Sequence, residues 1–345
     1  MLTYVSAKNE KKVAQAQLED NLKSALGDKG IRNIGFPSGN LDSRVFAAGH
    51  DKLWCTFRQL SQKDVRIPRY WNAFGTFDAK NGQALTINLE INIASDSNTE
   101  QVAGFFARDS ETGAVFLMHT GKIGGGRPGV GKVAFLVQSK ATLISVDVEN
   151  NVARDGILIG RVDDSYLSGH IWRFVQSVKR FKDAAVTGEL STQEFKDAVT
   201  DFERYNPEFS GVKKGSRKRT LEYDSYHGDV VHQLFEERSA RASKGEIVAN
   251  DSLVDLKVKN NGHVTEIYEV KTSFQRQILY TAIGQLLTHS ITAAKNQPIT
   301  KFLVVPDYEQ LPSDLFNAIN RLGIQIRKFK LVGSPKNRII ELLPP

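Results

Sequence analysis

Apolar residues recur along the chain with two different periods, and the change between the periods outlines the predicted elements. Residues 9–26 repeat apolar positions at helical spacing and stop at Gly27, which predicts an amphipathic helix. From about 32 to 148, β-branched and aromatic runs separated by turn residues predict strands. Two more amphipathic patterns, at 165–183 and after a capping box at 191–194, predict helices that complete a mostly β domain.

The periodicity breaks at residues 206–220, where proline, glycine and charged residues replace it. This composition predicts a basic linker between an N-terminal domain, residues 1–205, and a C-terminal domain, residues 221–345. Past the linker, the pattern predicts a helix, three strands, a helix, a strand, a helix, a strand and a last apolar segment. In that order the elements span 226–240, 246–249, 253–258, 264–271, 275–293, 300–305, 313–321, 324–331 and 338–343. The order is typical of an α/β sandwich with a mixed sheet.

Composition narrows the class of protein. The 345 residues include one cysteine, Cys55, so we expect neither an intrachain disulfide nor a thiolate zinc site. No stretch approaches the ~18 apolar residues of a membrane span, and the first residues lack the apolar core of a signal peptide. We therefore expect a cytoplasmic protein without a membrane span or a membrane partner.

The net charge is +7. Most of the excess positive charge lies in the linker, which contains five basic residues and one acidic residue. Such a segment is either a solvated connection or a strap that follows DNA phosphates. The candidate DNA contacts in it are Lys213, Lys214, Arg217, Lys218 and Arg219.

Charged residues interrupt two apolar strands of the C-terminal domain. Asp255 lies in the first strand, and the second ends in Glu269, Val270 and Lys271. A lone buried charge costs several kcal/mol, so these side chains are expected to bind a metal or one another. Residues two apart on a strand share a face, which puts Glu269 and Lys271 together.

The turn between the two strands decides whether Asp255 joins this face. A two-residue turn at 261–262 would send its carboxylate to the opposite face. A three-residue loop at 260–262 pairs Asp255 with Ile267 and makes it a diagonal neighbour of Glu269. We expect the three-residue loop.

Two carboxylates and the backbone oxygen of Val270 form an oxygen-only set of ligands, which suits Mg²⁺, or Mn²⁺ in its place. Lys271 beside that set could orient or deprotonate a water molecule, so the pattern favours hydrolysis of a phosphodiester. The structural alternative is an ion pair between Lys271 and the two acids.

Asp255 followed, after thirteen residues, by Glu269-Val270-Lys271 resembles the motif of the PD-(D/E)XK nuclease superfamily, with Val254 where the family name has proline. The element order from 226 to 305 is similar to the α-β-β-β-α-β core of that superfamily. The resemblance covers about a third of the chain. It implies a restriction-endonuclease-like fold in which Asp255 and Glu269 bind the metal and Lys271 positions the attacking water.

The same resemblance implies helpers on the two flanking helices. In related nucleases a glutamine or tyrosine on the helix after the motif orients the water or the phosphate, and Gln285 is the candidate here. Family members often supply one metal ligand from the preceding helix, for which His227 and Asp229 are candidates. For Gln285 the alternative is a hydrogen bond to neighbouring backbone, and for the other two it is a solvated helix start.

A glycine-rich segment at 121–131 superficially looks like a Walker A loop. Val133 replaces the hydroxyl residue that would hold Mg²⁺, and the run 133–137 predicts a strand where that motif needs a helix. What remains is either a flexible surface loop or a phosphate cradle. The candidate DNA contacts are Lys122, Arg127 and Lys132.

Residues 69–72 combine a cation, two aromatic rings and an amide, a mixture that suits stacking on bases and hydrogen bonds to their edges. The alternative is that the aromatic rings belong to the core of the β domain. The candidate contacts are Arg69, Tyr70, Trp71 and Asn72.

Together these patterns predict a Mg²⁺-dependent DNA endonuclease of the restriction or antiviral-defence type that leaves 5′-phosphate ends. Residues 1–205 would recognise specific or modified double-stranded DNA. Cutting two strands usually needs two active sites, so a homodimer is expected. The alternatives are a noncatalytic DNA-binding or partner-binding protein on a nuclease-like scaffold, and a defence effector nuclease activated by a small nucleotide or a protein.

Overall fold

Two units make up the chain, unit 1 from Met1 to Ser216 and unit 2 from Arg217 to Pro345. The division falls inside the segment 206–220 for which the sequence predicts a linker. The computed structural model describes residues 1–36, 39–47, 53–76, 84–124, 130–139, 141–148, 152–205, 226–249, 254–293, 298–308 and 310–344. In these residues the protein is a mixed α/β fold with seven α-helices and two sheets.

Unit 1 is mostly β, as its sequence pattern predicts. Its helices are α1 Lys8–Leu26, α2 Lys132–Ser139, α3 Leu167–Thr187, η1 Glu189–Ser191 and α4 Gln193–Tyr205. Its strands are β1 Leu2–Tyr4, β2 Asp28–Phe36, β3 Gly39–Ala47, β4 Leu53–Leu60, β5 Arg69–Thr76, β6 Leu85–Thr86, β7 Leu89–Glu90, β8 Ile93–Ala94, β9 Gly104–Asp109, β10 Val115–His119, β11 Ile144–Val148 and β12 Val152–Arg161.

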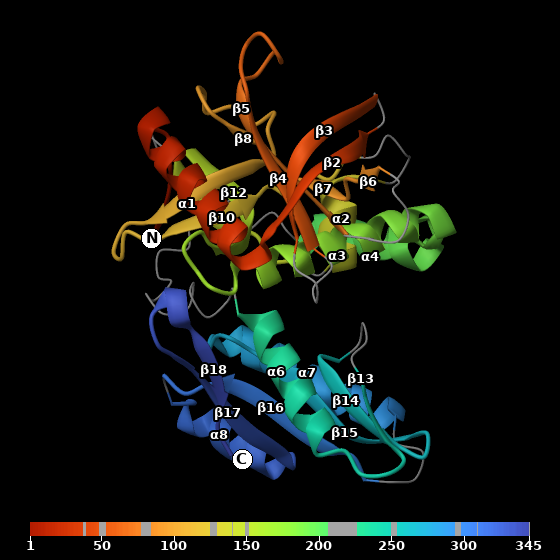
Figure 1. Ribbon diagram of the computed structural model, residues 1–345. Helices are drawn as coiled ribbons and strands as arrows, with labels where there is room; N and C mark the ends of the chain where they lie inside the picture. Colours follow the sequence, from red (N-terminus) through yellow and green to blue (C-terminus); the bar gives the residue numbers. More distant parts are fainter. Residues whose placement is uncertain are drawn as a thin grey trace. The chain divides into compact units, whose positions relative to one another are not determined.

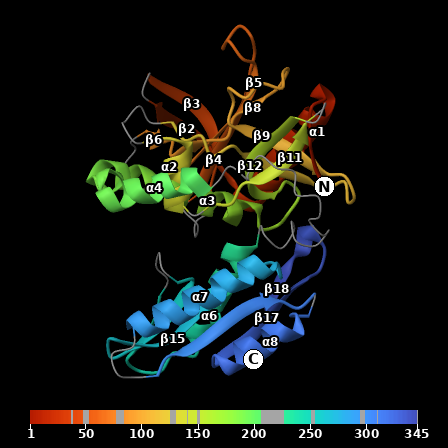
Figure 2. The same ribbon diagram turned by 180° about the vertical axis from the view of Figure 1, so that it is seen from behind.

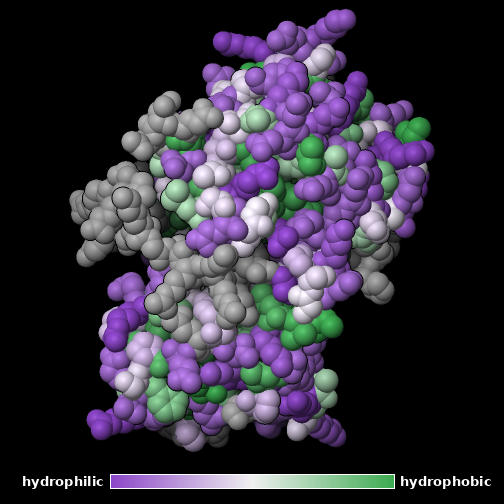
Figure 3. Space-filling view, turned by 90° about the vertical axis from the view of Figure 1, so that its left-hand side faces the viewer, coloured by the Kyte–Doolittle hydropathy of each residue, from purple (hydrophilic) through white to green (hydrophobic). Residues whose placement is uncertain are grey.

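The twelve strands of unit 1 belong to one sheet with the order β1-β11-β12-β10-β9-β8-β5-β4-β3-β2-β6, and β7 pairs with β5. Strand β1 pairs with both β11 and β9, which closes five strands into a ring. The helices α2, α3 and α4 lie side by side (Figures 1 and 2). On the face of unit 1 drawn in Figure 3, hydrophilic residues predominate and hydrophobic ones form small separate areas.

The core of unit 1 forms where α1 and α3 cover the sheet. Helix α1 buries residues four apart, including Leu18 and Leu22, as its helical period predicts. Those side chains join one cluster with Phe74 of β5, Phe106 of β9 and Phe181 of α3. The predicted helices at the two ends of unit 1 are therefore confirmed, and their apolar faces are core.

The strand predicted at 133–137 is wrong, because these residues belong to helix α2. A short run of consecutive apolar residues fits a buried helix as well as a buried strand, and packing decides between them. Here Ala134, Phe135 and Leu136 are buried, and the ring of Phe135 lies edge-on to Phe174 and Phe181 of α3. The glycine-rich segment therefore precedes a helix, although Val133 still lacks the hydroxyl group of a Walker A motif.

Unit 2 contains each element predicted for residues 226–343. Its elements are α6 His227–Ala240, β13 Glu246–Ala249, β14 Leu256–Asn260, β15 His263–Val270, α7 Arg276–Ala293, β16 Thr300–Pro306, α8 Ser313–Arg321, β17 Ile324–Val332, η3 Pro335–Asn337 and β18 Ile339–Leu342. The strand order is β13-β14-β15-β16-β17-β18. Strands β15, β16 and β17 run parallel, and the other neighbours are antiparallel, so the sheet is mixed.

Helices cover both faces of the unit 2 sheet. Figure 1 shows α6 in front of the sheet, and Figure 2, from behind, shows α7 in front of it. Ile267 of β15 and Leu303 of β16 pack with Leu279 and Leu286 of α7. Because β15 and β16 are covered on both sides, their alternate residues contact different helices, which decides where the charged residues of β15 point. No helix in the described ranges is long and apolar enough to cross a membrane.

Candidate functional site

The hairpin of β14 and β15 has a register that differs from the predicted one. Its loop has two residues, Asn261 and Gly262, with φ angles of 49° and 85°, and Asn260 pairs with His263. Two consecutive positive φ angles are typical of a type I′ turn, for which Asn-Gly is the preferred sequence. The prediction of a three-residue loop is therefore wrong.

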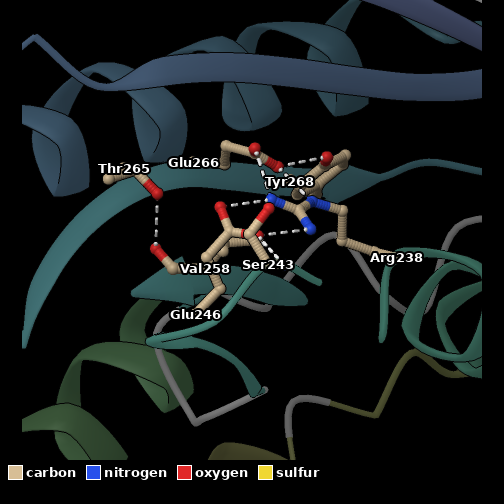
Figure 4. Close-up of polar contacts among 7 residues, drawn as sticks. All are labelled: Arg238, Ser243, Glu246, Val258, Thr265, Glu266 and Tyr268. Atoms are coloured by element: carbon tan, nitrogen blue, oxygen red, sulfur yellow. Dashed lines mark hydrogen bonds and ion pairs between the residues drawn. The ribbon is translucent and has the colours of Figure 1, made fainter. Parts of the chain in front are cut away.

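A two-residue turn alone would place the side chain of Asp255 on the face opposite Glu269, and a β-bulge in the hairpin reverses this effect. Between Val258 and Lys259 the register shifts, so Thr265 has no partner on β14, and its hydroxyl donates to the carbonyl of Val258 at 3.3 Å (Figure 4). Past the bulge, Leu256 pairs with Tyr268. Extending that register by one residue puts Asp255 opposite Glu269, on the face that the sequence analysis required.

Glu269, Lys271 and Gln285 meet on the side of the sheet that faces α7. The ammonium Nζ of Lys271 donates to Oε1 of Glu269 at 2.6 Å and to Oε1 of Gln285 at 3.3 Å. Glu269 is 3% exposed, and the side chain of Lys271 is 18% exposed. The structure thus brings together the motif lysine, its acid and the glutamine of the next helix.

Asp255 closes the other side of this cluster. Its Oδ2 accepts the backbone N–H of Val270 at 2.8 Å and lies 3.4 Å from Nε2 of His227. The same ring nitrogen is 3.2 Å from the carbonyl oxygen of Val270. His227, the first residue of α6, therefore contacts the cluster directly, whereas Asp229 is buried within that helix at 6% exposure. We refer to Asp255, Glu269, Lys271, Gln285 and His227 as the acid–lysine cluster.

Burial and the neighbouring charges shift the pKa values of the two carboxylates in opposite directions. For Glu269, burial and the repulsion of Asp255 raise the pKa against the pull of Lys271. For Asp255, burial acts in the same direction, but the charge and hydrogen bond of His227 outweigh it and hold the pKa below its usual value. The attraction of Asp255 outweighs burial at His227 as well, and raises the pKa of its ring. One acid is thus held ionised, and the other resists ionisation.

The cluster contains two carboxylates, Asp255 and Glu269, next to the carbonyl oxygen of Val270. Within the described ranges, no three His, Cys, Asp or Glu side chains gather as a metal-holding group. Mg²⁺ is commonly held by one or two carboxylates and keeps several waters, so a smaller protein set fits it. A cation near both acids would also offset the repulsion that raises the pKa of Glu269.

Two lysines that the sequence analysis missed share the strand face of Asp255. Alternation along β14 puts Lys257 and Lys259 on the same strand face as Asp255. Burial and, after it, the neighbouring charge of Lys259 lower the pKa of Lys257. Counting every second residue onward from Asp255 would have found both.

The candidate contacts of unit 1 have mixed outcomes. Trp71 is 7% exposed and belongs to a core cluster, and Tyr70 is equally buried in a second one. Asn72 is fully buried and exchanges hydrogen bonds with Gln15 of α1. The prediction that these three side chains contact bases is wrong, because packing and internal hydrogen bonds occupy them.

Other predicted contacts of unit 1 remain at or near its surface. Lys122 is exposed, and Lys132, the first residue of α2, is partly exposed. Arg69, the first residue of β5, is also partly exposed. The remaining candidates lie outside the described residues and are Arg127, Lys213, Lys214, Arg217, Lys218 and Arg219.

Comparison with known proteins adds no relative. No known protein family, no curated protein and no solved structure matches the chain.

Proposed function

We propose that the protein is a Mg²⁺-dependent DNA endonuclease whose active site is the acid–lysine cluster. The observation that carries the proposal is the meeting of Asp255, Glu269, Lys271 and Gln285 on adjoining elements. Ionisable groups whose pKa values are shifted by burial and by a specific charged neighbour are typical of functional sites. The element order of unit 2 supports a restriction-endonuclease-like fold of the PD-(D/E)XK type.

Asp255, Glu269 and the carbonyl oxygen of Val270 would hold Mg²⁺, with Mn²⁺ as a substitute. When bound, the ion neutralises charge that develops on the phosphate and the leaving oxygen. Lys271 would hold the attacking water through its ammonium group, which Glu269 and Gln285 orient from two sides. His227 keeps Asp255 ionised, as the lowered pKa of that acid indicates. Attack opposite the 3′ oxygen would leave a 5′-phosphate.

Lys257 and Lys259 would bind phosphates next to the scissile one, because they share the strand face of Asp255. Unit 1 would recognise the double-stranded DNA substrate, with Lys122 and Lys132 as surface cations. Restriction or antiviral defence is the role that such an arrangement fits. A homodimer would place two active sites on the two strands.

Cleavage by the full-length protein tests the proposal. Plasmid, modified DNA and RNA are incubated with and without Mg²⁺ or Mn²⁺, using wild type, Asp255→Asn and, as a matched control, Glu341→Gln. Glu341 is a surface acid of β18 that pairs with Lys330 at 3.1 Å, so its loss should not affect the site. We expect metal-dependent cutting of DNA by wild type and the control, and none by Asp255→Asn.

Undiminished cutting by Asp255→Asn would refute the assignment of the site. Absence of any metal-dependent product would favour a noncatalytic protein that keeps the cluster as a structural ion network. Cutting that starts only after a nucleotide or protein is added would identify an activated defence effector.

A further inference from the structure

A second site lies within unit 1. A cavity of about 1020 Å³ opens between the strands β5 and β7, the helix α3 and the residues that follow β10. Pockets for small ligands typically have volumes of ~300–1,000 Å³, so this one is large enough for an organic ligand rather than an inorganic ion. It is separate from the acid–lysine cluster, which belongs to unit 2.

The cavity wall carries an excess of positive charge. Among the described residues that line it, three are cations, Arg69 of β5, Lys122 after β10 and Lys182 of α3, and one is an acid, Glu90. Burial lowers the pKa of Lys182, an effect that Glu90 partly offsets, and its ammonium donates to the carbonyl oxygen of Asn88 at 2.7 Å. Cations kept in a partly buried wall favour an anionic ligand such as a phosphate.

Apolar and polar groups complete the wall. Ile87 and Ala185, which are partly exposed, supply apolar surface for a flat ring. Thr86 and Gln101, which are exposed, offer a hydroxyl and an amide that can donate to and accept from the polar edge of such a ring. A phosphate, an apolar ring and a polar ring edge together describe a nucleotide.

We propose that this cavity binds a single nucleoside phosphate. The nucleotide is either free in solution or turned out of a DNA duplex, which places the same chemical group in the same site. The inference deepens the recognition role proposed for unit 1 and rests on it. It does not depend on the chemistry of the hairpin in unit 2.

Binding without divalent metal tests the inference, so that cleavage plays no part. The probes for the full-length protein are the four deoxynucleoside 5′-monophosphates, inorganic phosphate, and DNA duplexes with or without one mismatched, unstacked base, all followed by calorimetry. The variants are Lys182→Gln, which removes a wall cation, and Val186→Trp, which fills the cavity from a position that is 64% exposed. Lys179→Gln removes the same charge from an exposed position of α3 outside the cavity and is the matched control.

We expect both cavity variants to weaken binding about tenfold or more, as the loss of one charge-assisted contact implies, and the control to bind like wild type. Tighter binding of monophosphates identifies a free nucleotide as the ligand. Preference for the mismatched duplex identifies a nucleotide turned out of DNA. The inference is overturned if no probe binds, if inorganic phosphate binds as tightly as the nucleotides, or if both cavity variants bind like the control. Thermal unfolding of each variant verifies that it is folded.

Discussion

The hairpin of β14 and β15 carries charged side chains on both faces. On one face the charged forms are stabilised, and on the other the charged form of an acid is disfavoured. Toward α6, Arg238 donates four hydrogen bonds to Glu246 and Glu266 (Figure 4). These bonds raise the pKa of Arg238 and lower that of Glu246, so each group is stabilised in its charged form. Toward α7, burial and Asp255 raise the pKa of Glu269, so the charged form of this acid is disfavoured.

This difference distinguishes a structural ion network on one face of the hairpin from the acid–lysine cluster on the other. The Arg238 cluster ties α6 to β13 and β15 and leaves its charges with bidentate partners, as a structural network should. The acid–lysine cluster instead holds two acids that repel each other around one lysine. A folded protein tolerates such repulsion where function needs it, and the cost is met by the stability of the surrounding structure.

The largest effect is expected from Lys271→Met. Removing the ammonium that bridges Glu269 and Gln285 leaves the attacking water without its positioning group, so DNA cleavage should fall about a thousandfold. Single-turnover cleavage in Mg²⁺ measures the rate. Lys330→Met, which removes a surface lysine of β17, is the control and should cut like wild type. A Lys271→Met protein with wild-type rates would contradict the division between the two faces.

Arg238→Met should have the largest effect on stability. It leaves the partly buried carboxylates of Glu246 and Glu266 next to each other without their shared cation, so the free energy of unfolding should fall. Urea unfolding of the full-length protein measures the loss. Adding Glu246→Gln and Glu266→Gln should recover part of it, because the uncompensated charges are then gone. If Arg238→Met is as stable as wild type, the α6 face is not the structural one.

Replacing Lys257 and Lys259 together by glutamine should weaken DNA binding without affecting the fold. Each lysine that contacts a phosphate contributes about one unit to the slope of log affinity against log salt concentration, so the double variant should lose about two. Binding measured at several salt concentrations in the absence of metal gives the slope. An unchanged slope would exclude these lysines from the DNA-binding surface.

The smallest effect, and one of opposite sign, is expected for Glu269→Gln. Because the folded protein raises the pKa of Glu269, its ionised form costs stability at neutral pH, and stability falls as pH rises through that raised pKa. The glutamine variant should be more stable than wild type at pH 7, and its stability should lose this pH dependence. Urea unfolding at pH 4 and pH 7 measures both. A destabilised variant at pH 7 would show that this acid is structural.

The sequence predicts most of unit 2 because its elements follow simple periods. Residues 226–343 alternate helical and strand patterns with clear turn signals, and each predicted element is present. The predicted hairpin register is wrong, although Asp255 lies on the predicted strand face. Asn261-Gly262 forms the two-residue turn that the local sequence favours. The bulge at Val258 and Lys259, which the local sequence does not predict, returns the side chain of Asp255 to the face of Glu269.

Unit 1 was harder to predict because tertiary packing decides its ambiguous segments. The run 133–137 suits a strand by composition, but Phe135 packs on α3 as part of a helix. The aromatic pair Tyr70 and Trp71 looks like a stacking platform, but the two rings lie on opposite faces of the sheet and both are buried. Tyr70 joins the cluster that α1 and α3 complete, and Trp71 joins a cluster of residues from neighbouring strands. The sequence shows which residues have the chemistry to contact DNA, but the packing of the fold decides which of those residues are exposed to solvent.

Cleavage of plasmid DNA by the full-length Glu269→Gln protein in Mg²⁺ tests the central claim most directly, because this variant should be at least as stable as wild type. We predict loss of metal-dependent cutting by a protein that remains folded and still binds DNA. Cutting at the wild-type rate would contradict the claim that the acid–lysine cluster is the site of phosphodiester hydrolysis.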